Sequence, residues 1–424
     1  MTTHLTEIDR DEAAPTRWST VALLVGAGMV CAFQIGKAPA ALGHLRADLG
    51  FGLVTAGWVI SMFNVIGVGL GTLLGAATSR IGDRRMVLGG LWLTAAASLV
   101  GATSLGPTLL LATRFIEGLG FLAAVIGVPA LIIRLARPGD YKLAFGLWGT
   151  YMPAGTAFMM LLSPLFLAPF GWRGLWLANA VLVGLFAAML AAATRGLRHG
   201  APTPAPGLAT LGRDMWETVR AGGPPLVALA FASYTLNFIA VLGFLPTILV
   251  EREGLSQPLA ATLTAIAIAA NVPGNLAGGV LLHRGVARWR LVTSASLVMA
   301  LCAFGIYSDA LPLAARYALT VLFSTVGGVL PATVLGWAPA TAPTARHAPT
   351  ANGLLVQGSH FGQMLGPPAL AALAVASGDW SWSPLVLVAS AAVGIACALA
   401  LRRLERRHRA VSSPQPVVGQ AEIR

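Results

Sequence analysis

The residues best able to do chemistry in this sequence are four ionisable side chains that stand inside long apolar runs. They are Lys37, Arg114, Glu117 and Arg316, and Glu117 is the sole carboxylate among them. A charge at the centre of a bilayer costs at least ~2.5–3.5 kcal/mol on insertion scales, so charges kept in such runs are the first candidates for function. Glu117 follows Arg114 by three residues, which places both on one face of a helix.

The basic members of this set can attract an anion. Arg114 and Arg316 could clamp a carboxylate or a small inorganic anion through forked hydrogen bonds, with Lys37 adding charge. Three cations against one carboxylate leave a formal charge of +2, which favours an anionic substrate over a cationic one. Structural roles are the alternative, because Arg114 and Glu117 can neutralise each other while Lys37 and Arg316 can extend to the membrane surface.

Two of the embedded groups can carry a proton. Glu117 can take one up when Arg114 is engaged elsewhere. His360 is the one histidine deep in an apolar run, and histidine titrates near neutral pH. The alternative for His360 is a neutral side chain that only forms a hydrogen bond.

Neutral polar side chains in the same runs are further candidates for binding a substrate. Amides inside a membrane commonly form hydrogen bonds to neighbouring helices instead. The Gly-x3-Gly that follows Asn64 and Asn271 also signals close helix packing. We expect the binding candidates to be Gln34, Asn64, Asn271, Tyr151 and Gln357.

Composition predicts that the chain is an integral membrane protein. Of its 424 residues, 56% are hydrophobic and only 10% are charged, whereas soluble domains carry about 25% charged residues. The three cysteines lack the spacing of metal ligands, and no phosphate-binding loop or nucleophile with an evident base is present. We therefore expect no metal, no cofactor, no direct use of ATP and no enzymatic activity.

Long apolar runs predict an all-helical fold with twelve transmembrane helices. A helix needs about 20 apolar residues to cross a bilayer, and the interior Gly and Pro residues are typical of bundled membrane helices rather than of β-barrels. The predicted spans are 18–43, 52–78, 86–104, 108–134, 142–168, 173–194, 225–250, 258–282, 291–308, 311–337, 350–376 and 382–402.

The distribution of basic residues predicts how the chain lies in the membrane. Most Lys and Arg residues fall in loops and tails on the side of the N-terminus, whereas the other side holds only Arg46, Arg173 and Arg252. By the positive-inside rule both termini are cytoplasmic, in a multi-pass protein of the plasma (inner) membrane. The net charge of +12 is thus a signal of topology, and no nucleic-acid partner is expected.

An internal repeat divides the chain into halves. At an offset of 207 residues, Asn64-Val65-x-Gly67-x3-Gly71 matches Asn271-Val272-x-Gly274-x3-Gly278, and Pro39 matches Pro246. The segment around Arg114 matches the segment around Arg316 at an offset of 202. The predicted organisation is a tail 1–17, a six-helix bundle 18–194, a Pro-rich linker 195–224 with a short surface helix around 213–220, a second six-helix bundle 225–403 and a tail 404–424.

The loop after the second span resembles the Gly-x3-Asp-Arg-x-Gly-Arg-Arg signature of the major facilitator superfamily. Ser79 takes the Asp place and Asp83 takes an Arg place, so the match is partial. Arg114, Gly118 and Gly120 resemble a second element of the family, and the segment from Gly146 to Gly155 is similar to its cyanate/nitroimidazole transporter branch. The signature implies a charge latch that gates the conformational change, formed here by Gly75, Arg80, Gly82, Arg84 and Arg85.

The resemblance implies two pseudo-symmetric bundles that alternate access to a central site. We therefore predict a monomeric secondary transporter whose partners are a small-molecule substrate, protons and membrane lipids. Its substrate is predicted to be a small organic or inorganic anion moved with protons. The alternatives are proton-driven efflux of a lipophilic compound and, from a different class, a membrane sensor or receptor that binds a ligand without moving it.

Overall fold

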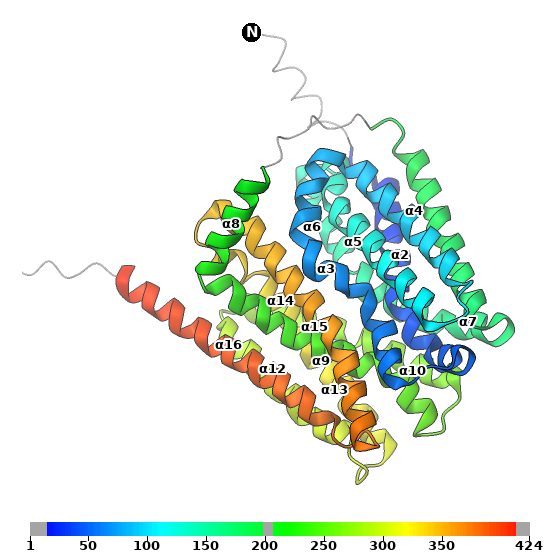
Figure 1. Ribbon diagram of the computed structural model, residues 1–424. Helices are drawn as coiled ribbons and strands as arrows, with labels where there is room; N and C mark the ends of the chain where they lie inside the picture. The colour runs from blue at the N-terminus through cyan, green and yellow to red at the C-terminus, as the bar shows by residue number, and fades with distance from the viewer. Residues whose placement is uncertain (1–14, 198–206, 413–424) are drawn as a thin grey trace, which may run out of the picture.

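The computed structural model describes residues 15–197 and 207–412, and no strand occurs within these ranges (Figure 1). Interior glycines and prolines divide several of the predicted spans into shorter helices. The helices are α2 (Trp18–Leu49), α3 (Leu53–Ile81), α4 (Asp83–Gly101), α5 (Pro107–Leu135), α6 (Tyr141–Gly149), α7 (Tyr151–Ala193), α8 (Leu208–Arg220), α9 (Gly223–Glu251), α10 (Gln257–Ala269), α11 (Asn271–His283), α12 (Arg288–Ile306), α13 (Leu313–Gly327), α14 (Val329–Leu335), α15 (Ala348–Ser377) and α16 (Ser383–Ser412).

These helices are consistent with the predicted twelve crossings of a membrane. Within the described residues, nine helical segments are long and apolar enough to cross one. One of the nine, Pro138–Ala193, contains two crossings because α7 breaks at Gly171, whose φ of 63° suits a residue without a side chain. The helices α4 and α15 supply the other two crossings.

The outward faces of the helices are apolar, as a lipid environment requires. Leu165, Val181 and Leu276 are each more than 65% exposed. Exposing such side chains to water would cost free energy, whereas lipid tails are as apolar as the side chains themselves. The fold is therefore that of an integral membrane protein.

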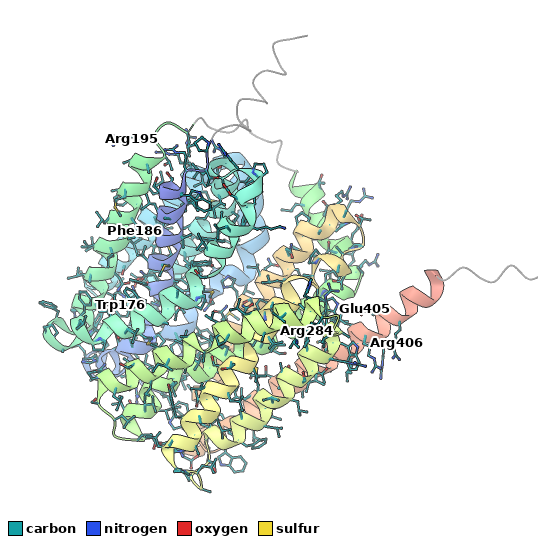
Figure 2. The ribbon with its side chains drawn as sticks, turned by 180° about the vertical axis from the view of Figure 1, so that it is seen from behind. Trp176, Phe186, Arg195, Arg284, Glu405 and Arg406 are labelled. Atoms are coloured by element: carbon teal, nitrogen blue, oxygen red, sulfur yellow. The ribbon has the colours of Figure 1, made fainter. Side chains whose placement is uncertain are left out.

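Two groups of helices pack around each other, α2–α7 (the first half) and α9–α16 (the second half). The main packing between the halves joins α3 to α15 and α7 to α10. We call the end of the bundle where α2 begins, α7 ends and α8 lies the linker end. Figure 2 shows Arg195 where α7 ends, and it shows Arg284 and Arg406 near the ends of α11 and α16 in the second half. The other end is called the opposite end.

Glycines allow the paired helices to approach closely. A Cβ at Gly57 would lie 2.8 Å from the backbone of Pro368, on the contact between α3 and α15. A Cβ at Gly274 in α11 would overlap the carbonyl oxygen of Thr325 in α13. The repeated Gly-x3-Gly thus supports packing between neighbouring helices in the second half.

Gly274→Ala should lower the stability of the protein, because the added methyl group must displace backbone. Overpacking of this kind costs about 1–3 kcal/mol. The matched control is Gly279→Ala on the same helix, where nothing lies within 4 Å of the added Cβ. Thermal unfolding of the purified protein in detergent measures both, and equal melting temperatures for the two variants would contradict this account of α11.

Candidate functional site

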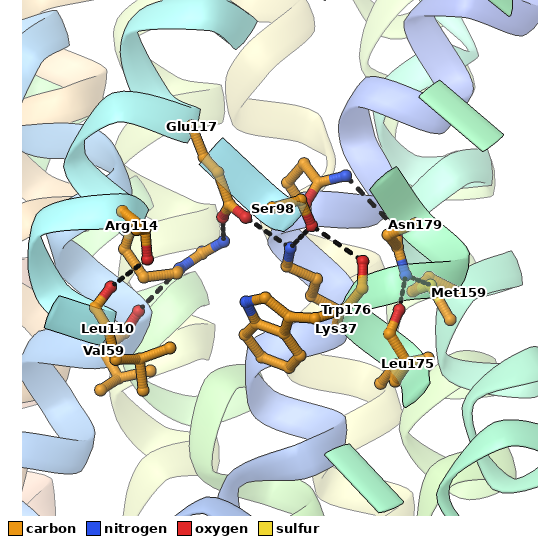
Figure 3. Close-up of polar contacts among 12 residues, drawn as sticks. Lys37, Val59, Ser98, Leu110, Arg114, Glu117, Met159, Leu175, Trp176 and Asn179 are labelled. Atoms are coloured by element: carbon orange, nitrogen blue, oxygen red, sulfur yellow. Dashed lines mark hydrogen bonds and ion pairs between the residues drawn. The ribbon is translucent and has the colours of Figure 1, made fainter. Parts of the chain in front are cut away.

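Three of the four embedded charges form one buried cluster in the first half (Figure 3). Lys37 on α2 donates to Oε1 of Glu117 at 2.6 Å, and Arg114 donates to Oε2 of the same carboxylate at 2.6 Å. All three residues are fully buried. We call these residues the charge cluster.

The surroundings of the charge cluster accept one further hydrogen bond from each of its cations. Lys37 also donates to Oγ of Ser98 at 2.7 Å, and Nε of Arg114 donates to the carbonyl of Val59 at 3.1 Å. The Lys37 ammonium lies 4.4 Å from the ring centre of Trp176, so a cation–π contact supports it as well. These contacts hold the cluster between α2, α3, α4, α5 and α7.

The charge cluster carries two cations and one anion, so its formal charge is +1 when every group is ionised. Removing one proton from Lys37 would make it neutral, because Glu117 is already ionised in that state. A buried site of this kind is able to exchange a proton with little rearrangement, since its donors and acceptors already contact one another. This geometry differs from the expectation that Lys37 and Arg114 face a substrate, because both side chains point at Glu117.

The fourth embedded charge lies apart from the cluster. Both terminal nitrogens of Arg316 donate to the carboxylate of Glu253 at 2.7 Å, near the opposite end. Arg114 and Arg316 therefore occupy matching places in the repeat, yet each has a partner in its own half. The structure does not bring the two arginines together as a clamp.

Two of the neutral candidates stay within the first half. The amide of Gln34 donates to Oδ1 of Asn179 at 3.4 Å, which fits the role of joining two helices. Tyr151 stacks on Trp148 with 4.2 Å between ring centres. A Cβ at Gly28 would lie 2.5 Å from the Trp148 ring, so this aromatic pair packs directly against α2.

At the centre of the molecule, the described hydrogen bonds between the halves join neutral polar groups. Nδ1 of His360 on α15 lies 3.0 Å from Oδ1 of Asn64 on α3, and the His360 ring packs against Gly67. The side chain of Gln357 lies one turn away, beside Gly71. The structure thus brings Asn64 close to His360 and Gln357, which follow it in the sequence by about 300 residues.

Asn271 lies within the second half, although it is the repeat partner of Asn64. Its amide donates to Tyr234 Oη at 3.0 Å and to the Ser324 carbonyl at 2.9 Å. Its amide nitrogen therefore joins α11 to α9 and α13.

The predicted gating loop is only partly described. Gly75 and Arg80 belong to residues 72–80 of α3, whose side chains lie outside the described part of the chain. Gly82 has a φ of 89°, Arg84 donates to Oγ1 of Thr194 at 2.9 Å, and Arg85 is exposed.

Asp83 stands where the family signature has an arginine, and it has acquired its own partner. Arg134 at the end of α5 donates to both of its carboxylate oxygens, at 2.7 and 2.8 Å. The described charges of this loop thus bind α4 to α5 and α7 within the first half.

Two acidic side chains of the linker helix α8 form a cluster with a histidine of the segment before α15, which the sequence alone does not predict. Asp214, Glu217 and His347 place one ligand atom each within 4.8 Å of one another. Arg346 already donates to Asp214 at 2.5 Å, and hydrogen bonding from Arg213 lowers the pKa of Glu217. These ion pairs account for the cluster as a tie between α8 and the segment before α15.

Comparison with known proteins identifies the family. The model of the Major Facilitator Superfamily matches residues 23–348. The chain is 28% identical over 167 residues to the puromycin resistance protein pur8 of Streptomyces alboniger, which covers 39% of this chain and 33% of that protein. It is 29% identical over 184 residues to the cephamycin export protein CmcT of Amycolatopsis lactamdurans, covering 43% and 38%. The match thus spans little more than a third of these relatives' length.

Solved structures share the fold over almost the whole chain. A bacterial homologue of the human lysosomal transporter Spinster, in an inward-facing and occupied conformation, matches with a TM-score of 0.73 at 15% identity and covers 96% of this chain and all of that one. The POT family transporter PepTSo matches with the same TM-score and identity over 92% and 98%. At these identities the likeness concerns the fold alone.

Glu117→Gln should destabilise the protein far more than Lys37→Met. The first change leaves two buried cations without a counter-charge, and breaking a buried pair in this way costs about 3–5 kcal/mol. The second leaves Arg114 and Glu117 as a balanced pair.

Chemical unfolding of the purified variants measures the difference. Equal losses of stability in Glu117→Gln and Lys37→Met would show that Glu117 does not balance both cations.

Proposed function

The chain belongs to the major facilitator superfamily, and we propose that it is a secondary transporter that exports a small lipophilic organic compound. Its relatives' names support the export of a small organic compound: they include a puromycin resistance protein, a cephamycin export protein and the methyl viologen resistance protein SmvA of Salmonella typhimurium. All three names refer to small organic compounds, one as the object of export and two as compounds to which the protein gives resistance.

The observation that carries this proposal is the pairing of the embedded cations. Lys37 and Arg114 share Glu117, and Arg316 is held by Glu253 with two hydrogen bonds. A site for an anion would need at least one of these cations turned toward the space between the halves. Instead, the described polar contacts at the centre of that contact are neutral, which favours a substrate with a large apolar surface.

Orientation follows from the basic residues at the linker end. We propose that this end is cytoplasmic and that the protein lies in the plasma (inner) membrane. An enzyme reporter fused after residue 412 should then be active if it is one that works in the cytoplasm. A reporter that requires the other side of the membrane should be inactive at the same place.

The described contacts between the halves suggest which side is closed. Bonds that join the two halves lie toward the opposite end and the centre, and they support a state that is closed on the outside and opens toward the cytoplasm. They connect Arg46 with Glu251, Gln257 with the Ala40 carbonyl, Ser61 with the Gln363 carbonyl and Asn64 with His360.

We assign proton coupling to the charge cluster. It holds the embedded carboxylate, it differs from neutrality by one proton, and it contacts α3, α4 and α7 besides its own helices, so a change of charge there would alter their packing. His360 is the second candidate, because it lies on the contact between the halves and its Nδ1 contacts Asn64. Gln34 and Tyr151 would act indirectly, by fixing the helices around the cluster.

Transport of an anion with protons is a second candidate. The excess cation of the charge cluster favours it, provided that a conformational change exposes Lys37. A ligand-binding sensor is the third, and it predicts saturable binding without any movement of ligand.

Export should be measurable in inside-out vesicles from cells that express the protein. An acid-inside pH gradient should drive accumulation of methyl viologen or puromycin, the compounds that the relatives' names suggest as probes. Loss of a preloaded small carboxylate, driven by the same gradient, would instead favour the anion candidate, because an anion carried with protons moves in the same direction as they do. Binding of a probe to the purified protein with no accumulation of any compound would favour the sensor.

Glu117→Gln should uncouple transport from protons. Accumulation driven by the pH gradient should be lost, leaving only equilibration of the substrate across the membrane, because the cluster no longer has the carboxylate against which its proton is held and released, whereas exchange of labelled for unlabelled substrate at equal pH should persist. Asp48→Asn is the control, since this carboxylate pairs with Arg173 at the opposite end. Normal gradient-driven transport by Glu117→Gln would remove Glu117 from the coupling mechanism.

A further inference from the structure

A small pocket lies between the two halves at the opposite end, away from the charge cluster. Its volume is about 270 Å³, just below the range of about 300–1,000 Å³ typical of pockets for drug-sized ligands. The last turns of α2 and α9 and the first residue of α10 form its walls. It is lined by Pro39, Ala40, Gly43, His44, Ala47, Pro246, Thr247, Val250, Glu251 and Gln257.

The internal repeat explains where this pocket lies. Pro39 and Pro246 are repeat partners at the offset of 207 residues, and the same offset pairs Ala40 with Thr247 and His44 with Glu251. Equivalent turns of α2 and α9 therefore face each other across the pocket. The repeat is not exact, however, and the changes from Ala40 to Thr247 and from His44 to Glu251 place oxygen-bearing side chains on the wall formed by α9.

The polar groups of the pocket favour a cation. Among its lining residues only Glu251 carries a formal charge, and its side chain is 48% exposed. Oγ1 of Thr247 is buried without a hydrogen-bond partner, and the residue as a whole is only 5% exposed. A carboxylate and an unengaged hydroxyl oxygen are both able to accept hydrogen bonds from an ammonium group.

The rest of the lining limits what else can enter. Prolines, alanines and Val250 form apolar walls that suit short alkyl groups. The Gln257 amide already donates to the Ala40 carbonyl at 3.2 Å and lies 3.1 Å from Nδ1 of His44. It therefore closes one side of the pocket and is not free to hold an anion.

We propose that this pocket binds a small organic ammonium ion, held by Glu251 and Thr247. If the protein exports lipophilic compounds as proposed above, the pocket is the place where a cationic substrate pauses before release, and this role rests on that function. Binding of the ammonium ion to the pocket does not rest on that function. The competing account is purely structural: the ion pair of Glu251 with Arg46, at 2.6 Å, would only hold the halves together.

Protection of a cysteine in the pocket wall tests the proposal on the full chain in detergent, without any need for transport. Ala47→Cys is introduced after the buried Cys31, Cys302 and Cys397 have been changed to Ser. The reaction of the introduced thiol with a charged methanethiosulfonate reagent is then followed with butylammonium, and with n-butanol as the neutral ligand of similar shape.

Butylammonium should slow the reaction of the introduced thiol in a saturable manner, and n-butanol should not. Glu251→Gln and Thr247→Val should each weaken this protection by about tenfold, the effect of losing one charge-assisted or buried hydrogen bond. Asp48→Asn, a neighbouring carboxylate on α2 that does not line the pocket, should leave it unchanged.

Three results would overturn the proposal: no protection by butylammonium, equal protection by both ligands, or unchanged protection in both Glu251→Gln and Thr247→Val. Since Glu251→Gln also breaks the contact with Arg46, Thr247→Val is the variant that isolates ligand binding. Export that persists without protection would refute the site alone. Protection without export would refute the proposed function and leave the binding site standing.

Discussion

The neutralisation of buried charge is the constraint on which the first half depends. Glu117 is fully buried and serves two cations at once, one from its own helix and one from α2. Without its carboxylate, two cations would stand in an apolar interior at a cost of several kcal/mol each. The packing of α2, α4 and α5 is therefore tied to the ionisation of one side chain, which is the physical condition for coupling a proton to a conformational change.

Close helix contact is what converts such a local change into a movement of the halves. His360 fits against Gly67 because that residue has no side chain, and Gly57, ten residues earlier on the same helix, admits Pro367 and Pro368 in the same way. The α3–α15 contact is thus tightly fitted along much of its length. A tightly packed surface has few alternative arrangements, so it tends to shift as a unit rather than deform gradually.

Much of the fold, but little of the site, could be predicted from the sequence. Apolar run length and the repeat can be read from the sequence alone, and they predict the crossings even where two of them follow each other in α7, separated by the break at Gly171. The pairing of Lys37 with Glu117 joins residues 80 positions apart, and that of Arg316 with Glu253 joins residues 63 apart. Residue type shows that a partner is needed, but only the packing of the helices determines which one is in reach.

The broken symmetry of the repeat bears on how the two halves divide their work. Arg114 finds its carboxylate three residues along its own helix, so it can lie deep in the first half, whereas Arg316 depends on Glu253 beyond the end of α9 and lies near the opposite end. The second half accordingly has no described counterpart of Lys37 and Glu117 at its centre. If protons act through buried ionisable groups, they change the packing of the first half. The second half then moves with it through the neutral contact between α3 and α15.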